Sequence, residues 1–447
     1  MTEAVEARDT EGKGVLYRTL WRWHFYAGLI CIPFVIWLAA TGSVYLFRPQ
    51  LEAWLDRDYT ALERTGSPAS QQQIVDAALA THPGSTLSAI VLPEHPDDAA
   101  RVVISDHGAR TRVYLHPDTL EVLKVREESG TLERAIFRLH GELMMGPWGS
   151  YLVELAACWA IVMILTGLYL WWPRGAKGLG GVLYPRLGQG RKRFWRDLHA
   201  VVGVWVSAFA LFLLFTGLPW ATVWGGAFKS VREMTGTAAV SQDWKLAGSD
   251  EHAEHRAQDA ASAAHHHHGG ASLDAIVATA TAQGLAAPVL LTPPTAAQPV
   301  WWAKSDAQNR PARADVAISP ETGEAVVRKT FGEKHVIDQI VGIGIAAHEG
   351  QLFAPLNQIL GVLTAVGLVT LCVSAFVMWR RRAPAGVLGA PPPIPDARIG
   401  WGLAVLILTC AVLLPVLGIS LLLIGALEWG VLRRLPAARR WLGLSPA

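Results

Sequence analysis

Charged residues are scarce in this chain of 447 residues, because only 17% are Asp, Glu, Lys or Arg while 51% are hydrophobic. The formal net charge of +2 says nothing about nucleic acid, but no nucleic-acid-binding motif is present, so nucleic acid is not expected as a partner. No Gly-rich G-x-G-x-x-G fingerprint follows a predicted strand and no flavin module is visible. The chain is therefore expected to hold no dinucleotide of its own.

Cysteine is also rare, and its positions exclude two classes of site. All four cysteines lie inside apolar runs, so neither a disulfide framework nor a thiolate metal site is predicted: Cys31, Cys158, Cys372 and Cys410. The first fifteen residues are polar and acidic, and the first apolar run is too long for the core of a signal peptide. We expect that run to be retained as a membrane helix.

Long apolar runs are what the chain has in abundance. Each is long enough to cross a bilayer, which takes about 20 residues; they span roughly 25–47, 146–172, 200–224, 355–379 and 399–427. Lys and Arg gather before the first run, in the segment 173–196 and at 380–382, always on the same side of successive spans. The positive-inside rule therefore predicts a cytoplasmic N-terminus and two long external segments.

The first and third runs share a pattern that indicates internal duplication. His24 is followed by Gly28 and then by Thr41-Gly42, and His199 is followed at the same spacings by Gly203 and Thr216-Gly217. The second and fourth runs match as well. Thr166 lies twenty-six residues after His140, and Ser374 lies twenty-six residues after His348; Trp171 and Trp379 each lie thirty-one after the same histidines. We predict a duplicated bundle of four core transmembrane helices plus a C-terminal apolar segment.

The two external segments are predicted to be α+β modules. In the first, a helix over 71–84 precedes alternating strands over 91–106 and 111–129; in the second, a helix over 273–284 precedes strands over 299–306 and 312–331. Pro117 to Glu121 and Pro320 to Glu324 form matching turns. The insertion 241–270 has no apolar period and is expected to be a disordered loop.

These patterns give the predicted boundaries. They are 1–47 for the N-terminal tail and first helix, 48–135 for the first module, 136–224 for the second and third helices with the basic loop 173–196, 225–340 for the second module, 341–398 for the fourth helix and its loop, and 399–447 for the C-terminal segment and basic tail. Pro415 and Gly418 leave two alternatives for the last segment: a single span, or a tight helical hairpin that returns the tail to the cytoplasm.

Histidine inside a membrane helix is costly and usually functional. His24 and His199 are predicted near the cytoplasmic face, His140 and His348 near the external face. Packing is the alternative for any one of them, but four at matched positions favour cofactor binding. Zinc takes three or four protein ligands, whereas two opposed imidazoles suit a six-coordinate haem b. We predict two bis-histidine haems, held by His24 with His199 and by His140 with His348.

Other residues are weaker candidates. Arg22 and Arg196 are predicted partners of haem propionates, although both also serve as topology signals. Glu142 and Glu349 lie beside the outer histidines as possible hydrogen-bond acceptors, and Glu154 lies well inside a span, where proton handling or a polar neighbour would explain it. Trp301-Trp302 could stack on a ligand or belong to the core. A divalent or ferrous ion could be collected by His252, His255, His265, His266, His267 and His268.

The motifs WRWHFYAGL, FRLHGELMMG, TGLYLWWPR, RDLHAVVGVW and the final WRRR resemble the PepSY-associated transmembrane family, which includes inner-membrane siderophore reductases of the ferrioxamine type. The resemblance covers about residues 15–382. It implies PepSY-like modules in the periplasm, b-type haem on His24, His140, His199 and His348, and reduction of a ferric siderophore to release Fe(II). We assign His140 and His348 as the catalytic residues. The His-rich insertion departs from the family pattern and leaves the metal substrate open.

The leading hypothesis is therefore a multi-pass protein of the bacterial inner membrane that reduces a ferric siderophore or other ferric chelate outside. Electrons would come from a cytoplasmic reductase or from quinol, because the chain has no nucleotide site. One alternative is a transporter or metal-handling protein without redox activity, which the parallel repeats would also suit. A weaker alternative is a regulator of a protease, which would have no need of four intramembrane histidines.

Overall fold

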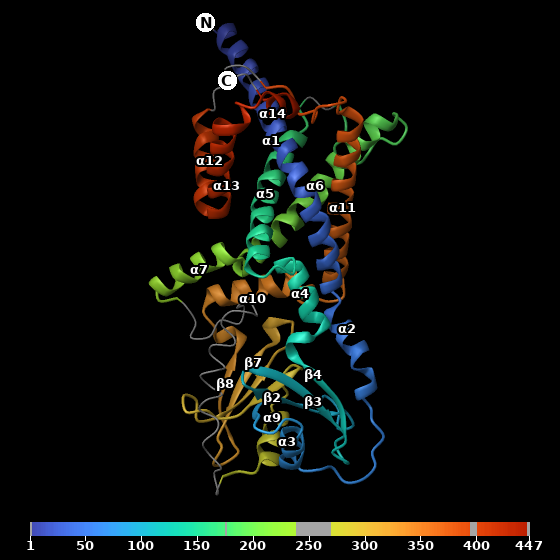
Figure 1. The fold of residues 1–447 in the computed structure, drawn as a ribbon, viewed down its shortest axis with the longest axis vertical. Coiled ribbons are helices and arrows are strands. Elements are labelled where there is room, and N and C mark those ends of the chain that lie inside the picture. Colours follow the sequence, from blue (N-terminus) through green and yellow to red (C-terminus); the bar gives the residue numbers. More distant parts are fainter. Residues whose placement is uncertain (1, 175–176, 238–269, 394–399, 445–447) are drawn as a thin grey trace. The chain divides into compact units, whose positions relative to one another are not determined.

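The computed structural model describes residues 2–174, 177–237, 270–393 and 400–444. The chain divides into two compact units (Figure 1). The helical unit comprises Met1–Val44, Arg138–Val231 and Ile359–Ala447, and the sheet unit comprises Tyr45–Phe137 and Arg232–Gln358. Each unit is therefore assembled from segments far apart in the sequence.

The helical unit contains the predicted membrane helices. Its long helices are α1 (Thr2–Tyr45), α5 (Pro147–Trp171), α6 (Arg191–Gly217) and α11 (Leu356–Arg382). Five helical segments in the described part of the chain are long and apolar enough to cross a bilayer: Gly14–Tyr45, Pro147–Trp171, Arg191–Trp220, Leu356–Arg382 and Pro415–Leu432. The prediction of a multi-pass membrane protein with four long helices and a C-terminal apolar segment is confirmed at this level.

The C-terminal segment forms two helices rather than one continuous span. Helices α12 (Trp401–Leu413) and α13 (Pro415–Leu427) are separated by Leu414, whose backbone leaves the helical conformation before Pro415. They pack side by side as a hairpin, and α14 (Pro436–Leu442) follows (Figure 1). The thirteen residues of α12 rise only about 20 Å, which is shorter than the roughly 30 Å hydrocarbon core. Of the two predicted alternatives, the structure has the hairpin.

The predicted start of two membrane helices needs correction. His140 was expected to open the second membrane helix, and His348 the fourth. Instead, His140 lies near the end of α4 (Leu132–Glu142) and His348 ends α10 (Val336–His348), so each histidine precedes a break in the helix. After α4 the break is tight, because a Cβ at Gly149 would lie 1.6 Å from the carbonyl oxygen of Glu142. Only glycine fits there, and the α4–α5 corner depends on it.

The matched tryptophans at the ends of α5 and α11 hold the loops that follow them. The indole Nε1 of Trp171 donates to the carbonyl of Val182 at 3.1 Å, and that of Trp379 donates to the carbonyl of Leu388 at 2.8 Å. A buried indole usually finds a hydrogen-bond acceptor. In both halves of the chain the tryptophan therefore fixes the loop after its helix.

The sheet unit differs most from what the sequence predicts, which was two separate α+β modules. The two predicted modules share one antiparallel sheet with the strand order β4-β3-β2-β1-β5-β6-β7-β8. Its strands are β1 (Thr86–Val91), β2 (Ala100–Asp106), β3 (Ala109–Leu115), β4 (Val122–Glu127), β5 (Val289–Thr292), β6 (Trp301–Ser305), β7 (Ala314–Ile318) and β8 (Ala325–Thr330). The halves meet where β1 pairs with β5, with Ile90 opposite Leu291 and Val91 opposite Leu290.

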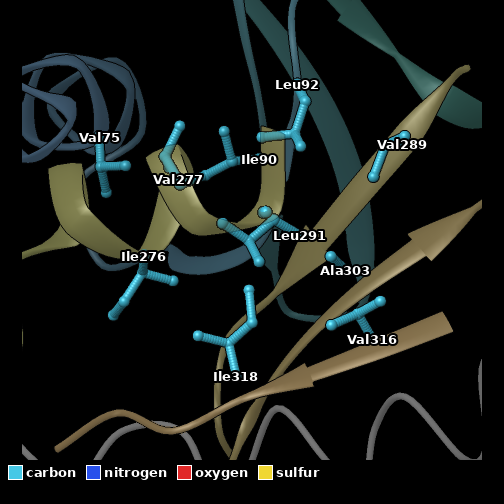
Figure 2. Packing of buried hydrophobic residues seen from close by; sticks show 11 residues of the cluster. Val75, Ile90, Leu92, Ile276, Val277, Val289, Leu291, Ala303, Val316 and Ile318 are labelled. Atoms are coloured by element: carbon cyan, nitrogen blue, oxygen red, sulfur yellow. The ribbon is translucent and has the colours of Figure 1, made fainter. Parts of the chain in front are cut away.

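One face of the sheet carries the hydrophobic core of this unit. Helix α2 (Arg48–Leu55) begins the sheet unit, and α3 (Gln71–Ala80) and α9 (Leu273–Ala282) pack against the sheet. Figure 2 shows the main cluster, in which Ile276 and Val277 of α9 lie over Leu291, Val316 and Ile318. This cluster includes residues from both halves, such as Val75 and Ile90 of the first. The two halves therefore fold around a shared core.

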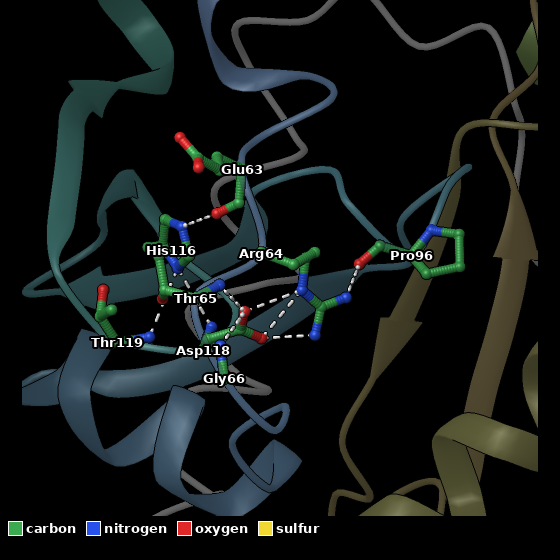
Figure 3. Close-up of polar contacts among 8 residues, drawn as sticks. All are labelled: Glu63, Arg64, Thr65, Gly66, Pro96, His116, Asp118 and Thr119. Carbon is green, nitrogen blue, oxygen red and sulfur yellow. Dashed lines mark hydrogen bonds and ion pairs between the residues drawn. The ribbon is translucent and has the colours of Figure 1, made fainter.

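A polar network closes the turn after β3 (Figure 3). The carboxylate of Asp118 accepts hydrogen bonds from the Nε of Arg64 at 2.8 and 3.0 Å and from the backbone N–H of Thr65 at 2.9 Å. The ring of His116 contacts the carbonyl of Glu63 at 3.1 Å. These contacts tie the segment after α2 to the turn. They also lower the pKa of Asp118 to about 2, mainly through the Arg64 hydrogen bonds.

We predict that the sheet unit loses stability in acid through Asp118. The folded pKa of about 2 lies below the ordinary 3.8, so the carboxylate contributes stability above about pH 4 and loses this contribution as the pH falls toward 2. Asp118→Asn should lower the melting temperature at pH 7 and flatten its dependence on pH between 4 and 2. Asp76→Asn, on the exposed side of α3, is the control. A D118N protein that melts like the control at every pH would contradict this.

Candidate functional site

The structure brings His24 of α1 and His199 of α6 together. Their ring centres lie 6.4 Å apart and their planes are at 82° to each other. The two residues are 175 positions apart in sequence and sit at matched positions of the two halves. The predicted inner pair therefore exists as a pair of neighbouring imidazoles.

Each of these rings has its Nδ1 against a hydroxyl of a neighbouring helix. The Nδ1 of His24 lies 3.1 Å from the Oγ1 of Thr166 on α5. The Nδ1 of His199 lies 3.1 Å from the Oγ of Ser374 and 3.2 Å from the carbonyl oxygen of Leu371, both on α11. The sequence marked Thr166 and Ser374 as matched positions, but it gave no indication that they contact the histidines of the other pair of helices.

The hydroxyl protons decide which ring nitrogen carries hydrogen. Thr166 donates its own proton to the carbonyl of Val162 at 2.8 Å, and Ser374 donates to the carbonyl of Leu371 at 2.9 Å. Their oxygens are then free only to accept, so the Nδ1 of each neutral imidazole must be the donor. The Nε2 of His24 and of His199 keeps its lone pair, which is the state that a metal ligand requires.

His140 shows the same arrangement near the end of α4. Its Nδ1 lies 3.0 Å from the Oγ1 of Thr41 on α1, and Thr41 donates its proton to the carbonyl of Trp37 at 2.8 Å. Burial lowers the pKa of His140 to about 4, so the ring is neutral at pH 7. It too presents an Nε2 lone pair.

Glycine allows two of these rings to approach a helix backbone. A Cβ at Gly167 would lie 3.1 Å from the Cε1 of His24, and a Cβ at Gly42 would lie 3.0 Å from the Cε1 of His140. In Thr166-Gly167 and in Thr41-Gly42, the threonine hydroxyl therefore orients the histidine ring, and the glycine leaves space for that ring. At Gly28, which follows His24 in the repeated pattern, an added Cβ would meet only the sulfur of Met163 at 3.7 Å, an ordinary contact.

The inner pair fits a haem by its donor set and its spacing. Two imidazoles are fewer ligands than a zinc site built from protein side chains needs, but they suit a metal whose other four ligands come from a porphyrin. Metal–imidazole bonds of about 2 Å place two ring centres on opposite sides of one iron roughly 6–7 Å apart. The observed 6.4 Å agrees with that spacing.

The remaining predicted haem residues have other surroundings. His348 ends α10 in the sheet unit, and its pairing with His140 stays a prediction. Arg22 donates to the backbone carbonyls of Pro391 at 2.5 Å and Gly443 at 2.7 Å, and the side chain of Arg196 is 68% exposed. Contacts of either arginine with propionates stay predictions.

The acidic neighbours of the outer histidines do not share one role. Glu142 was predicted as a hydrogen-bond acceptor for His140. Its carboxylate instead lies 3.7 Å from Arg138 on the same helix, and the hydroxyl of Thr41 contacts His140. Glu349 is buried, and burial raises its pKa. The six histidines of the insertion, His252, His255, His265, His266, His267 and His268, lie outside the described residues.

Trp301 and Trp302 point to opposite faces of β6. Trp301 packs against the hydrophobic core of the sheet unit. Trp302 lies on the other face, with the amines of Lys304 and Lys329 at 5.8 and 5.5 Å from its ring centre. Adjacent residues of a strand point to opposite faces, so Trp301 belongs to this core, as predicted, and Trp302 does not.

Glu154 caps a helix. The residue is 2% exposed, and its carboxylate accepts from the backbone N–H groups of Val223 at 2.8 Å and Trp224 at 2.9 Å, at the start of α7 (Thr222–Met234). The first N–H groups of a helix have no partner within it, and an anion there is stabilised by the helix dipole. Of the two predicted roles, pairing with a polar neighbour describes the contacts of Glu154.

We predict that Glu154→Ala lowers the stability of the helical unit by about 1–2 kcal/mol, because two partly buried N–H groups lose their acceptor. Glu154→Gln should cost less, since the amide oxygen still accepts. Thermal unfolding of the detergent-solubilised protein measures both. Glu428→Ala, which removes a half-exposed ion pair with Arg433, is the control. Equal melting temperatures for E154A and the control would exclude the capping role.

Comparison with known families gives one result. The profile described as the PepSY-associated TM region matches residues 21–382, a range that contains all four predicted haem ligands and both halves of the sheet. No curated protein matches the chain.

Proposed function

The chain belongs to the PepSY-associated TM region family, and on this premise we propose that it is a di-haem electron-transfer protein of the bacterial inner membrane. It reduces a ferric siderophore or another ferric chelate on the periplasmic side and releases Fe(II). The observation that carries the proposal is the pair of neutral imidazoles of His24 and His199, with 6.4 Å between ring centres and both Nε2 atoms available.

The chain's own residues supply the ligands and their orientation. His24 and His199 hold the inner haem, and His140 with His348 hold the outer one. When bound, haem iron would supply one-electron chemistry between the ferric and ferrous states. With His24 and His199 at one site and His140 and His348 at the other, the bound groups would supply one-electron reducing power to a chelate outside without the chelate's iron being bound by these histidines.

The separation of the two sites supports a relay of two haems. Thr41, which contacts His140, lies seventeen residues after His24 on α1. At 1.5 Å per residue this is roughly 25 Å of helix, most of the thickness of the hydrocarbon core. A single cofactor at His24 would leave that distance unbridged. Because no nucleotide fingerprint is present, a cytoplasmic reductase or quinol supplies the electrons.

Internal duplication accounts for the arrangement. The contact of His24 on α1 with Thr166 on α5 corresponds to the contact of His199 on α6 with Ser374 on α11. The sheet is also symmetric about its centre. Strands β1 to β4 run in order from the centre to one edge, and their counterparts β5 to β8 run in order from the centre to the other edge. Both features support two PepSY-like halves in parallel orientation, with the sheet in the periplasm and the N-terminus in the cytoplasm.

We predict that purified protein shows reduced-minus-oxidised haem b bands with two haems per chain. His24→Ala or His199→Ala should remove about half of the absorbance, and His140→Ala or His348→Ala the other half, because each haem needs both axial ligands. Exposed His95→Ala is the control. Trapping Fe(II) with a ferrous chelator during turnover of ferrioxamine tests the reductase activity. A colourless wild-type protein would contradict the proposal and would favour a transporter.

Gly167→Ala should disturb the inner haem alone. The added methyl would lie 3.1 Å from the Cε1 of His24, closer than ordinary contact, so the ring has to move. We expect a weakened or shifted α-band from the inner haem and an unchanged outer one. Gly28→Ala is the matched control, because its methyl has ordinary contact at 3.7 Å. Identical spectra for the two variants would show that the ring tolerates the methyl.

A further inference from the structure

We propose that the hydroxyl groups of Thr166, Ser374 and Thr41 are positioning residues that set the reduction potentials of the two haems separately. Thr166 and Ser374 act on the inner haem and Thr41 on the outer one. This inference rests on the proposed function, because it concerns the histidines as haem ligands. It assigns a role to side chains that do not touch the cofactor.

The hydroxyls form short hydrogen-bond chains that run in one direction. At Thr166 the order is Nδ1–H of His24, hydroxyl, carbonyl of Val162, with distances of 3.1 and 2.8 Å. At Thr41 the order is Nδ1–H of His140, hydroxyl, carbonyl of Trp37, with 3.0 and 2.8 Å. A hydroxyl that donates to a carbonyl becomes a better acceptor, because consecutive hydrogen bonds polarise one another.

The acceptor on Nδ1 changes the ligand strength of Nε2. A hydrogen bond from the distal N–H of an imidazole raises the basicity of the nitrogen that binds the metal. A more basic ligand stabilises the ferric ion, with its higher charge, more than the ferrous ion. The hydroxyls therefore lower the potential of the haem whose ligand they hold, and removing one raises it.

The arrangement predicts that the effects are local. Ser374 and Thr166 hold the two ligands of the inner haem, one on each side, while Thr41 lies roughly 25 Å farther along α1. Hydrogen bonds act through direct contact, so a change at one site should leave the other haem unaffected. A general loosening of the bundle would instead shift both haems.

The experiment is a spectroelectrochemical titration of the haem-loaded, full-length protein. Thr166→Val and Ser374→Ala remove the hydroxyls of the inner site, and Thr41→Val removes that of the outer site. At the wild-type midpoint of the affected haem, the ratio of reduced to oxidised haem should rise roughly three- to tenfold, since one hydrogen bond is lost. The other haem should keep its midpoint. His140→Ala, which retains only the inner haem, assigns the two signals.

Matched variants separate hydroxyl chemistry from packing. Thr364→Val removes a buried hydroxyl of α11 that donates to the carbonyl of Leu360 at 2.8 Å, and it should leave both midpoints unchanged. Thr166→Ser keeps a hydroxyl and should keep the wild-type midpoint. If T166V loses haem while T166S retains it, the orienting role of the hydroxyl is supported; loss in both variants would assign the effect to packing and overturn the inference.

Failure of this inference is distinct from failure of the proposed function. The positioning role would be overturned if the midpoint potentials of T166V, S374A and T41V shift no more than that of T364V. If haem binding still requires all four histidines in that case, the di-haem proposal stands. Wild-type protein without haem would remove both.

Discussion

A neutral imidazole in a membrane bundle has one nitrogen that must donate and one that must accept, and little water is present to serve either. In this protein the donor nitrogen is satisfied by a hydroxyl of a neighbouring helix, at Thr41, Thr166 and Ser374. Those contacts join α1 to α5, α6 to α11 and α4 to α1. Because the donor is satisfied within the protein, the second nitrogen of each ring stays available for a cofactor, and the proposed chemistry depends on this.

The sequence predicted the features that depend on composition and spacing. Four of the five long apolar runs became single helices of membrane-spanning length, and the equal spacing after His24 and His199 correctly indicated neighbouring rings. The spacing of Thr166 from His140 was visible as well, but its partner is His24. Periodicity along one chain shows which positions are equivalent, whereas contact between helices depends on their packing angle, which the pattern does not contain.

The errors also have physical causes. The helices that end near His140 and His348 were merged with the membrane helices, because the breaks after them depend on backbone conformations, such as those of Leu143 and Met144 with positive φ, that these residue types rarely adopt. Strands β1 and β5 were not singled out, because their apolar runs, Ala89–Val91 and Val289–Leu291, lack alternation. Ile90 and Leu291 face each other across the β1–β5 pair at the centre of the sheet, and both belong to the hydrophobic core. This pair of strands joins the two halves.

The union of the two halves has a consequence for how copies of the protein meet. A sheet that joins at its centre has only its outermost strands, β4 and β8, with a strand neighbour on one side. Both carry basic residues, Lys124 and Arg126 on one and Arg328 and Lys329 on the other. Like charges repel when two such strands align, so self-association by strand addition is disfavoured, and concentrated protein should not form sheet-linked aggregates.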